Sequence, residues 1–323
     1  MKLKVVGRPL GRIEGPEKVG GQTRYTADVQ LPGMIWGKCL RSPVTHARIL
    51  RVDTSRAKKL QGVRAILTGE DLPSLRVGLS LQDIPVLAQG KVRFAGEKVA
   101  AVAAENLAVA EEALSLIEVD YEELPSVFDP IKAMRPDAPL IHEELGSYKG
   151  FHHPPETIPN VFALQIWSAG DLALGFREAD VVLEHTFRTQ LAHQAYIEPH
   201  ACVVAVDSSD RVEVWASCKA PFRLKEQLSQ QLNLPKDHIR VHVIAVGGDF
   251  GGKGSLMDIP LCYHLAKVAG RPVKIVMTYA EELTAGDPRH PSVVRLKTGV
   301  KRDGSIVARE AEAEDVYVRV AAV

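Results

Sequence analysis

The feature that most constrains this chain is a glycine-rich octapeptide, Gly-Gly-Asp-Phe-Gly-Gly-Lys-Gly, at residues 247–254. It follows a strand-like apolar run at 239–246 and precedes a helix-like segment that starts near Asp258. Glycines between a strand and a helix allow bare backbone to approach a ligand closely. A need for flexibility does not explain the bulky Phe250 among them. The sequence therefore predicts a ligand against this loop.

Two other interpretations of the loop remain open at this stage. Glycine-rich connections also join strands to helices in α/β proteins that bind nothing there. The loop also approaches the P-loop pattern G-x-x-x-x-G-K-[ST], with Gly247, Gly252 and Lys253 in place. Gly254 stands where the Mg²⁺-binding hydroxyl belongs, and Ser255 comes one position late. Nucleotide binding is therefore the weaker alternative.

Length and charge exclude several classes of protein. The 323 residues suffice for two domains with apolar cores. Lys plus Arg equals Asp plus Glu, 40 against 40, so the net charge favours neither nucleic acid nor an anionic membrane as a partner. No apolar run reaches the roughly 18 residues of a membrane span, and the basic start lacks the apolar stretch of a signal peptide. We therefore expect a cytoplasmic protein.

The cysteines do not form a cofactor motif. Cys39, Cys202, Cys218 and Cys262 include no CxxC pair, and zinc or cysteine-bound iron–sulfur sites need closer grouping. A disulfide framework is not expected in a chain of this size and class. We predict four ordinary thiols, buried or half-buried.

A proline-rich stretch at 136–160 predicts the main boundary in the chain. Prolines at this density prevent regular helix and are typical of an extended connector. The expected organisation is a domain at 1–135, a linker at 136–160 and a second, incomplete domain at 161–323. The prolines of the stretch and its edge are Pro130, Pro136, Pro139, Pro154, Pro155 and Pro159.

Apolar patterning predicts mixed α/β structure on both sides of this boundary. In the first domain, a strand at 99–104, a helix at 108–116 and a strand at 117–121 are interpreted as a β-α-β unit, and residues 62–68 as a further strand. The second domain is predicted to contain a hairpin at 201–207 and 211–216, a helix marked by Leu224, Leu228 and Leu232, a strand at 239–246, a helix from an N-capping Asp258 to Gly270, and a strand at 273–277. The glycine loop would thus follow a strand end, where α/β proteins usually bind ligands.

Several ordered segments together carry a family resemblance. The chain resembles the molybdopterin-binding large subunit of the xanthine oxidase/aldehyde oxidase family of molybdenum hydroxylases. The similarity runs from about Gly7 to about Glu312, with the "hammerhead" domain before the first cofactor-binding domain. The segments are 41–48, 60–63, 67–73, 92–100 and 119–125 for the hammerhead domain, and 193–200 and 247–253 for the cofactor-binding domain.

This resemblance implies a fold, a cofactor and a reaction. The fold class is mixed α/β: an a/b hammerhead domain followed by the first α/β molybdenum-cofactor-binding domain. The cofactor is molybdopterin with molybdenum, and the reaction oxidises a small aldehyde or N-heterocycle with water as the oxygen source. Electrons leave through [2Fe–2S] clusters and FAD, which are expected on partner subunits.

The resemblance also assigns roles to residues. Glu198 and His200 are expected to order the pocket from behind the cofactor. The glutamine that some members place near the metal aligns with Ala192, which leaves the role of Gln194 open. Lys253 points either to the cofactor or to solvent, and Asp249 replaces a frequent glycine or alanine for no reason visible in the sequence. No residue of this chain is expected to bind the metal directly. The expected cofactor-binding residues are Gly248, Asp249, Phe250, Gly251, Gly252 and Gln194.

The family's large subunits continue well beyond the segments matched here. The resemblance places the general-base glutamate on that missing part, so no catalytic residue is expected in this chain. One hypothesis is a split hydroxylase whose second molybdopterin-binding chain completes the site, with this chain inactive and prone to association on its own. The alternative is a truncated, non-catalytic relic or an assembly module. Gly254 stands where purine-oxidising members carry a glutamate, which disfavours xanthine as the substrate.

Overall fold

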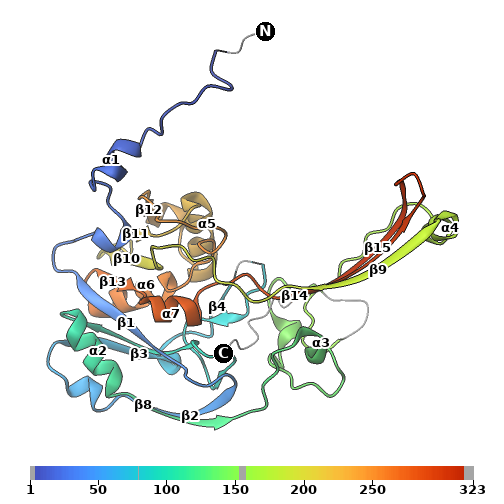
Figure 1. Ribbon diagram of the computed structural model, residues 1–323. Coiled ribbons are helices and arrows are strands. Elements are labelled where there is room, and N and C mark those ends of the chain that lie inside the picture. Colours follow the sequence, from blue (N-terminus) through green and yellow to red (C-terminus); the bar gives the residue numbers. More distant parts are fainter. Residues whose placement is uncertain (1–3, 79, 153–157, 316–323) are drawn as a thin grey trace.

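A seven-stranded mixed sheet forms the body of the protein (Figure 1). The computed structural model describes residues 4–78, 80–152 and 158–315. The first three residues of β1 pair in parallel with β13, which joins three strands from before the proline-rich stretch to four from after it. In spatial order the strands are β12 (Ile239–His242), β11 (Val212–Ala216), β10 (Ala201–Val206), β13 (Val273–Val276), β1 (Ile35–Arg41), β7 (Lys98–Ala104) and β3 (Val63–Thr68).

Helices bury both faces of this sheet. All seven residues of β7 are buried, which explains an apolar run without polar alternation. On one face Ala100 and Val102 pack with α2 (Leu107–Ser115). On the other face Ala101 and Ala103 belong to the large core that includes α6 (Ile259–Ala269). The helix α5 (Pro221–Leu232) adds Leu224 and Leu228 to that core, and α7 (Tyr279–Ala285) follows β13.

Smaller elements surround the body. The hammerhead region also contains a three-stranded sheet of β6 (Lys91–Val92), β2 (Ala47–Asp53) and β8 (Glu118–Glu123), and a two-stranded one of β4 (Arg76–Val77) and β5 (Ile84–Pro85). The short α-helices are α1 (Gly15–Val19) and α3 (Pro130–Ala133). The 3₁₀ turns are η1 (Thr26–Asp28), η2 (Ala57–Lys59), η3 (Gly69–Asp71), η4 (Leu145–Ser147) and η5 (Lys236–His238).

A second three-stranded sheet stands away from the body (Figure 1). It consists of β15 (Ile306–Asp315), β14 (Ser292–Val300) and β9 (Val181–Arg188), with β14 in the middle. The helix α4 (Leu172–Glu178) lies against its outer end. Close packing there depends on glycine, because a Cβ at Gly175 would lie 2.4 Å from the carbonyl oxygen of Val307. We call β9, β14 and β15 the outer sheet.

Most of the predicted elements are confirmed, including the mixed α/β class. The hairpin is β10–β11, the leucine stripe lies on α5, and Gly270 ends α6 in the left-handed conformation, with φ of 62°. The predicted β-α-β unit is wrong, because β7 and β8 lie in different sheets. The predicted strand at 239–246 ends at His242, although Ala245 still forms an isolated bridge with Tyr25.

The proline-rich stretch does not separate two sheets, since the main sheet takes strands from both sides of it. Pro154, Pro155 and the last eight residues of the chain lie outside the described residues. The domain boundaries at 135 and 161 therefore stay a prediction. All four cysteines are free, with three buried and Cys218 half-buried. No helix in the described ranges is long and apolar enough to cross a bilayer, and the cytoplasmic location stays a prediction.

Candidate functional site

The glycine loop is folded back on itself by Asp249. Its Oδ1 accepts a hydrogen bond from the amide of Lys253 at 2.6 Å, and its Oδ2 accepts one from the amide of Gly251 at 3.1 Å. The Lys219 Nζ donates to the same Oδ2 at 3.0 Å. Partial burial raises the pKa of this carboxyl, but the donors from Gly251 and Lys219 outweigh it and hold the pKa below its usual value. The structure thus explains Asp249: its carboxylate fixes the turn.

The glycines let the loop pack tightly onto the segment 194–198. A Cβ at Gly247 would lie 2.6 Å from the Glu198 Cβ, and one at Gly252 would lie 2.6 Å from the Tyr196 Cε1. Gly248 adopts a φ of 99°, where a side chain is strained as well as crowded by Tyr196. The sequence predicts that bare backbone approaches a ligand here. The structure shows that the glycines also let the loop contact residues 194–198 of the same chain.

The side chain of Lys253 packs inside the protein, against Glu198 and Tyr196, rather than extending into solvent. Its side chain is fully buried, and its Nζ donates to the Glu198 Oε2 at 2.7 Å. The same carboxylate oxygen accepts the amide of Gly247 at 2.7 Å. The ammonium also lies 4.7 Å from the ring centroid of Tyr196, within cation–π range. Lys253 therefore does not solvate the loop, and it anchors the far end of the loop to Glu198.

Behind this layer, one carboxylate fixes both Tyr196 and His200. Glu282 is completely buried, accepts the hydroxyl of Tyr196, and accepts the amide of His200 at 2.6 Å and its Nδ1 at 2.8 Å. Burial raises the pKa of Glu282, but the hydrogen bonds from His200 and Tyr196 lower it to about 2. Glu282 lies 82 residues from His200 in the chain, so no local sequence signal pointed to it.

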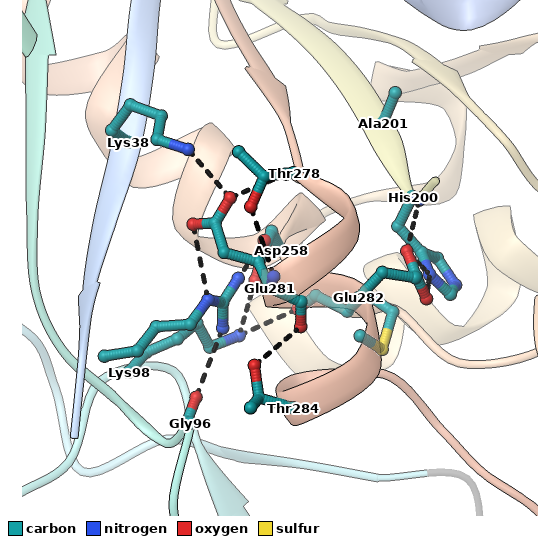
Figure 2. Close-up of polar contacts among 12 residues, drawn as sticks. Lys38, Gly96, Lys98, His200, Ala201, Asp258, Thr278, Glu281, Glu282 and Thr284 are labelled. Atoms are coloured by element: carbon teal, nitrogen blue, oxygen red, sulfur yellow. Dashed lines mark hydrogen bonds and ion pairs between the residues drawn. The ribbon is translucent and has the colours of Figure 1, made fainter. Parts of the chain in front are cut away.

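The preceding residue on α7 points the other way, into a second charged cluster (Figure 2). Glu281 accepts the Lys38 Nζ at 2.7 Å and caps its own helix through the amide of Thr278. Asp258 binds Arg41 at 2.9 Å and Lys98 at 3.2 Å. These five charged side chains, on β1, β7, α7 and the start of α6, link the two halves of the chain beside the main sheet.

The prediction that Asp258 is the N-cap residue of α6 is confirmed for its position, but not for the capping hydrogen bond that such a residue usually makes. Asp258 occupies the capping position, but its carboxylate makes no cap hydrogen bond and binds the cations of β1 and β7 instead. Burial raises its pKa, and the charges of Arg41 and Lys98 outweigh burial and lower the pKa to about 2. The Asp258 carboxylate therefore binds the cations of β1 and β7 rather than the free amides at the start of α6.

Gln194 is turned toward Asp287. Its Nε2 donates to the carbonyl of Asp287 at 2.8 Å, so the amide donor is already used inside the protein. Its Oε1 is buried, and no partner for it exists among the described residues. In the segment around it, Ala192 pairs with the backbone of Arg289. The role of Gln194 toward a cofactor stays a prediction.

The loop does not fit a phosphate-binding P-loop. Acceptors within the protein already occupy the amides of Gly247, Gly251, Gly252 and Lys253, and the lysine that would bind phosphate is buried. What remains without an internal acceptor is a short arc of backbone amides. Within the described part of the chain, the amides of Gly248, Asp249 and Phe250 meet no acceptor, and Phe250 as a whole residue is 75% exposed. This arc fits a cofactor that proteins hold mainly through backbone amides.

Two domain families match the chain in order. The aldehyde oxidase and xanthine dehydrogenase a/b hammerhead domain matches residues 20–125, and the molybdopterin cofactor-binding domain matches residues 152–315. The fold and the loop therefore define a molybdopterin-binding protein. The chain belongs to the molybdopterin-binding subunits of the xanthine oxidase/aldehyde oxidase family, which confirms the resemblance seen in the sequence.

Individual relatives agree with this assignment. The chain is 36% identical over 300 residues to a probable xanthine dehydrogenase component of Bacillus subtilis, covering 93% of this chain and 38% of that protein. It is 32% identical over 310 residues to the nicotinate dehydrogenase large molybdopterin subunit of Eubacterium barkeri, covering 96% of this chain and 70% of that protein. The CO dehydrogenase structure from Oligotropha carboxidovorans superposes with a TM-score of 0.84 at 32% identity, over 95% of this chain and 39% of that one.

Proposed function

We propose that this chain is the molybdopterin-binding component of a split molybdenum hydroxylase, completed by a second molybdopterin-binding chain. The chain spans well under half the length of the Bacillus relative and of the CO dehydrogenase chain. The Eubacterium subunit, by contrast, is matched over 70% of its length. That relative is itself much shorter than the Bacillus protein, which supports a molybdopterin-binding component of less than the larger length.

The observation that carries the proposal is the rigid arc of backbone at 248–250. Asp249 and the Lys253–Glu198 pair fix its two ends, while Tyr196 supports it from below. A preorganised row of amides binds an anionic group without reorganising. We assign Gly248, Asp249, Phe250, Gly251 and Gly252 to cofactor contact, with Gln194 beside them. Glu198 and His200 hold this surface from behind.

The bound cofactor would supply a two-electron oxidation of an electron-poor carbon, with water as the oxygen source. The substrate class is a small aldehyde or N-heterocycle. The residues of this chain orient the cofactor and exclude water from its inner side. The general base, a [2Fe–2S] subunit and an FAD subunit belong to the partners, so the isolated chain is expected to be inactive.

A matched pair of loop variants tests the assignment. Gly252→Ala forces a methyl group to within about 2.6 Å of Tyr196, whereas a Cβ at Gly254 meets nothing nearer than the Lys219 Cε at 3.9 Å. We expect the Gly252→Ala protein, purified with its partners from its native cells, to lose most of its molybdenum. The Gly254→Ala protein should keep it.

Molybdenum per chain by elemental analysis is the measurement, with melting temperature as the check on folding. Equal molybdenum in both variants would show that the loop does not hold the cofactor. Absence of molybdenum from the unmodified complex would instead favour the relic or assembly module.

A further inference from the structure

A small cavity lies beside Ser255, the residue that directly follows the glycine loop. Its volume is about 10 Å³, which corresponds to a single water molecule. We call it the Ser255 cavity. Residues 255–258 also border a second cavity of about 40 Å³, whose wall includes Phe94 and Ala285. The polar side chains on the wall of the Ser255 cavity are His200, Cys202, Ser217, Cys218, Ser255 and Asp258.

Most of these polar groups have partners within the chain. The Ser217 Oγ accepts the amide of Ala201 at 3.0 Å and donates to the Ala201 carbonyl at 3.3 Å. The Cys218 Sγ accepts a backbone amide at 3.3 Å, and Cys202 bonds to the thiol of a neighbouring cysteine. Asp258 is held by the two cations described above. These groups do not require a further ligand.

Two buried polar atoms on the same wall have no partner among the residues that the structure describes. They are the His200 Nε2 and the Ser255 Oγ. His200 is 7% exposed, and its Nδ1 lies 2.8 Å from the Glu282 Oε1. Because the Glu282 carboxyl, with a pKa lowered to about 2, is ionised, Nδ1 carries the ring proton that bonds to it. In the neutral ring Nε2 is therefore an acceptor, and it lacks a donor.

Buried polar groups are normally satisfied, and ordered water satisfies them where the chain offers no partner. We propose that the Ser255 cavity holds one water molecule, which donates a hydrogen bond to the His200 Nε2 and is bonded to the Ser255 hydroxyl. The cavity has the volume of one water and presents two polar groups, the fewest that a buried water requires. Within the described ranges no three metal-binding side chains converge, which favours water over a metal ion.

This water site adds an anchor at the end of the glycine loop. The internal hydrogen bonds described above fix residues 247–253, and Ser255 lies beyond them. His200 is itself fixed by Glu282 on α7. The water therefore joins the carboxyl-terminal end of the loop to α7 through His200. The inference does not rest on the split hydroxylase, because it requires only the fold of this chain.

A crystal structure of the unmodified chain, alone or in its native complex, tests the site directly. We expect one ordered solvent peak within about 3.2 Å of both the His200 Nε2 and the Ser255 Oγ. An empty cavity, a peak only in the larger cavity, or a Ser255 hydroxyl that donates directly to His200 would contradict the proposal. So would a metal ion, which anomalous scattering distinguishes from water.

Two substitutions of Ser255 test the anchor in solution. Ser255→Ala removes the hydroxyl, Ser255→Thr keeps it, and Ser209→Ala removes a hydroxyl from an exposed turn as the matched control. Exchange of the backbone amides at 251–255 is followed by mass spectrometry, with the melting temperature as the check on folding. We expect exchange about fivefold faster in Ser255→Ala, and an unchanged rate in Ser255→Thr and Ser209→Ala.

The outcomes separate the water site from its role as an anchor. In a crystal structure of Ser255→Ala the solvent peak should disappear, and its retention would show that the water does not depend on the Ser255 hydroxyl. An unchanged exchange rate in Ser255→Ala would overturn the anchor. Equally faster exchange in Ser255→Ala and Ser255→Thr would overturn it as well, because packing rather than the hydroxyl would then hold the loop. None of these results bears on the split hydroxylase, whose test is molybdenum in the native complex.

Discussion

The main sheet and the outer sheet differ in what covers their strands. The strand β7 is buried at every position between α2 and α6, whereas β9 is exposed at every position. Alanine, a weak strand former, fills four of the seven positions of β7, whereas β9 has three β-branched residues and a phenylalanine, so strand propensity does not explain why β7 is the buried one. The difference teaches that a strand of this chain is buried where helices cover both faces of its sheet, and that the strand pattern alone does not decide it. The stability of the described part of the chain should therefore reside mainly in the main sheet.

The largest effect should follow loss of a buried charge beside the main sheet. Asp258→Ala leaves Arg41 and Lys98, each with a side chain 11% exposed, without their shared carboxylate. We expect the free energy of unfolding to fall by about 3–5 kcal/mol, measured by urea denaturation. Asp120→Ala, which breaks an exposed ion pair of Arg51, is the control and should cost less than about 1 kcal/mol. Similar losses of unfolding free energy in the two variants would show that burial does not make the Asp258 ion pairs more important than an exposed one.

Truncation in the core of the main sheet comes next. Leu261 on α6 is fully buried in the core cluster, so Leu261→Ala should lower the free energy of unfolding by about 3 kcal/mol through lost burial and a cavity. Leu283→Ala on α7, where the side chain is 59% exposed, is the matched control and should change it by less than about 1 kcal/mol. A loss below about 1 kcal/mol in Leu261→Ala would mean that the core is not closed by α6.

Acid should weaken the same cluster by a smaller amount. The folded-state pKa of Asp258 is lowered to about 2 from its usual value of 3.8. A lowered carboxyl pKa contributes stability that is complete above the unfolded pKa and is lost as the pH falls through the folded one. We expect about 2 kcal/mol to disappear between about pH 4 and pH 2, measured as denaturant midpoints across that range. Asp258→Asn should flatten this part of the profile, and an unchanged profile would contradict the assignment.

The smallest effect is expected in the outer sheet of the isolated chain. Leu183→Ala removes an apolar side chain that is 45% exposed, so the free energy of unfolding should change by no more than about 0.5 kcal/mol. A loss above about 2 kcal/mol in the isolated chain would show that the chain covers its own outer sheet.

Local patterns in the sequence were enough for many elements but not for their assembly. The hairpin β10–β11, the helix α5 and the left-handed Gly270 follow from residues close in sequence. The parallel pairing of β1 with β13 joins residues 35–37 to residues 273–275, and local periodicity carries no information about such a partner. The outer sheet was not predicted at all, because it forms through the pairing of β9 with the distant β14.

The residues of the candidate site were likewise predictable only in part. The resemblance placed Glu198 and His200 near the loop, and the structure brings Glu198 into contact with Gly247. It gave no reason for an aspartate at position 249, because the turn that this carboxylate fixes exists only once the loop is folded. Glu282 was missed for a different reason, since only the folded chain places α7 under His200. Supporting residues of a site are therefore the hardest part to predict from one sequence.

We propose that this chain carries the molybdenum cofactor together with a second chain. The most direct test is elemental analysis for molybdenum, with mass spectrometry of the co-purifying chains, on the protein isolated from its native cells. We predict molybdenum in a complex with a chain that matches the remainder of the family's large subunit. A pure chain with neither molybdenum nor such a partner would contradict the account.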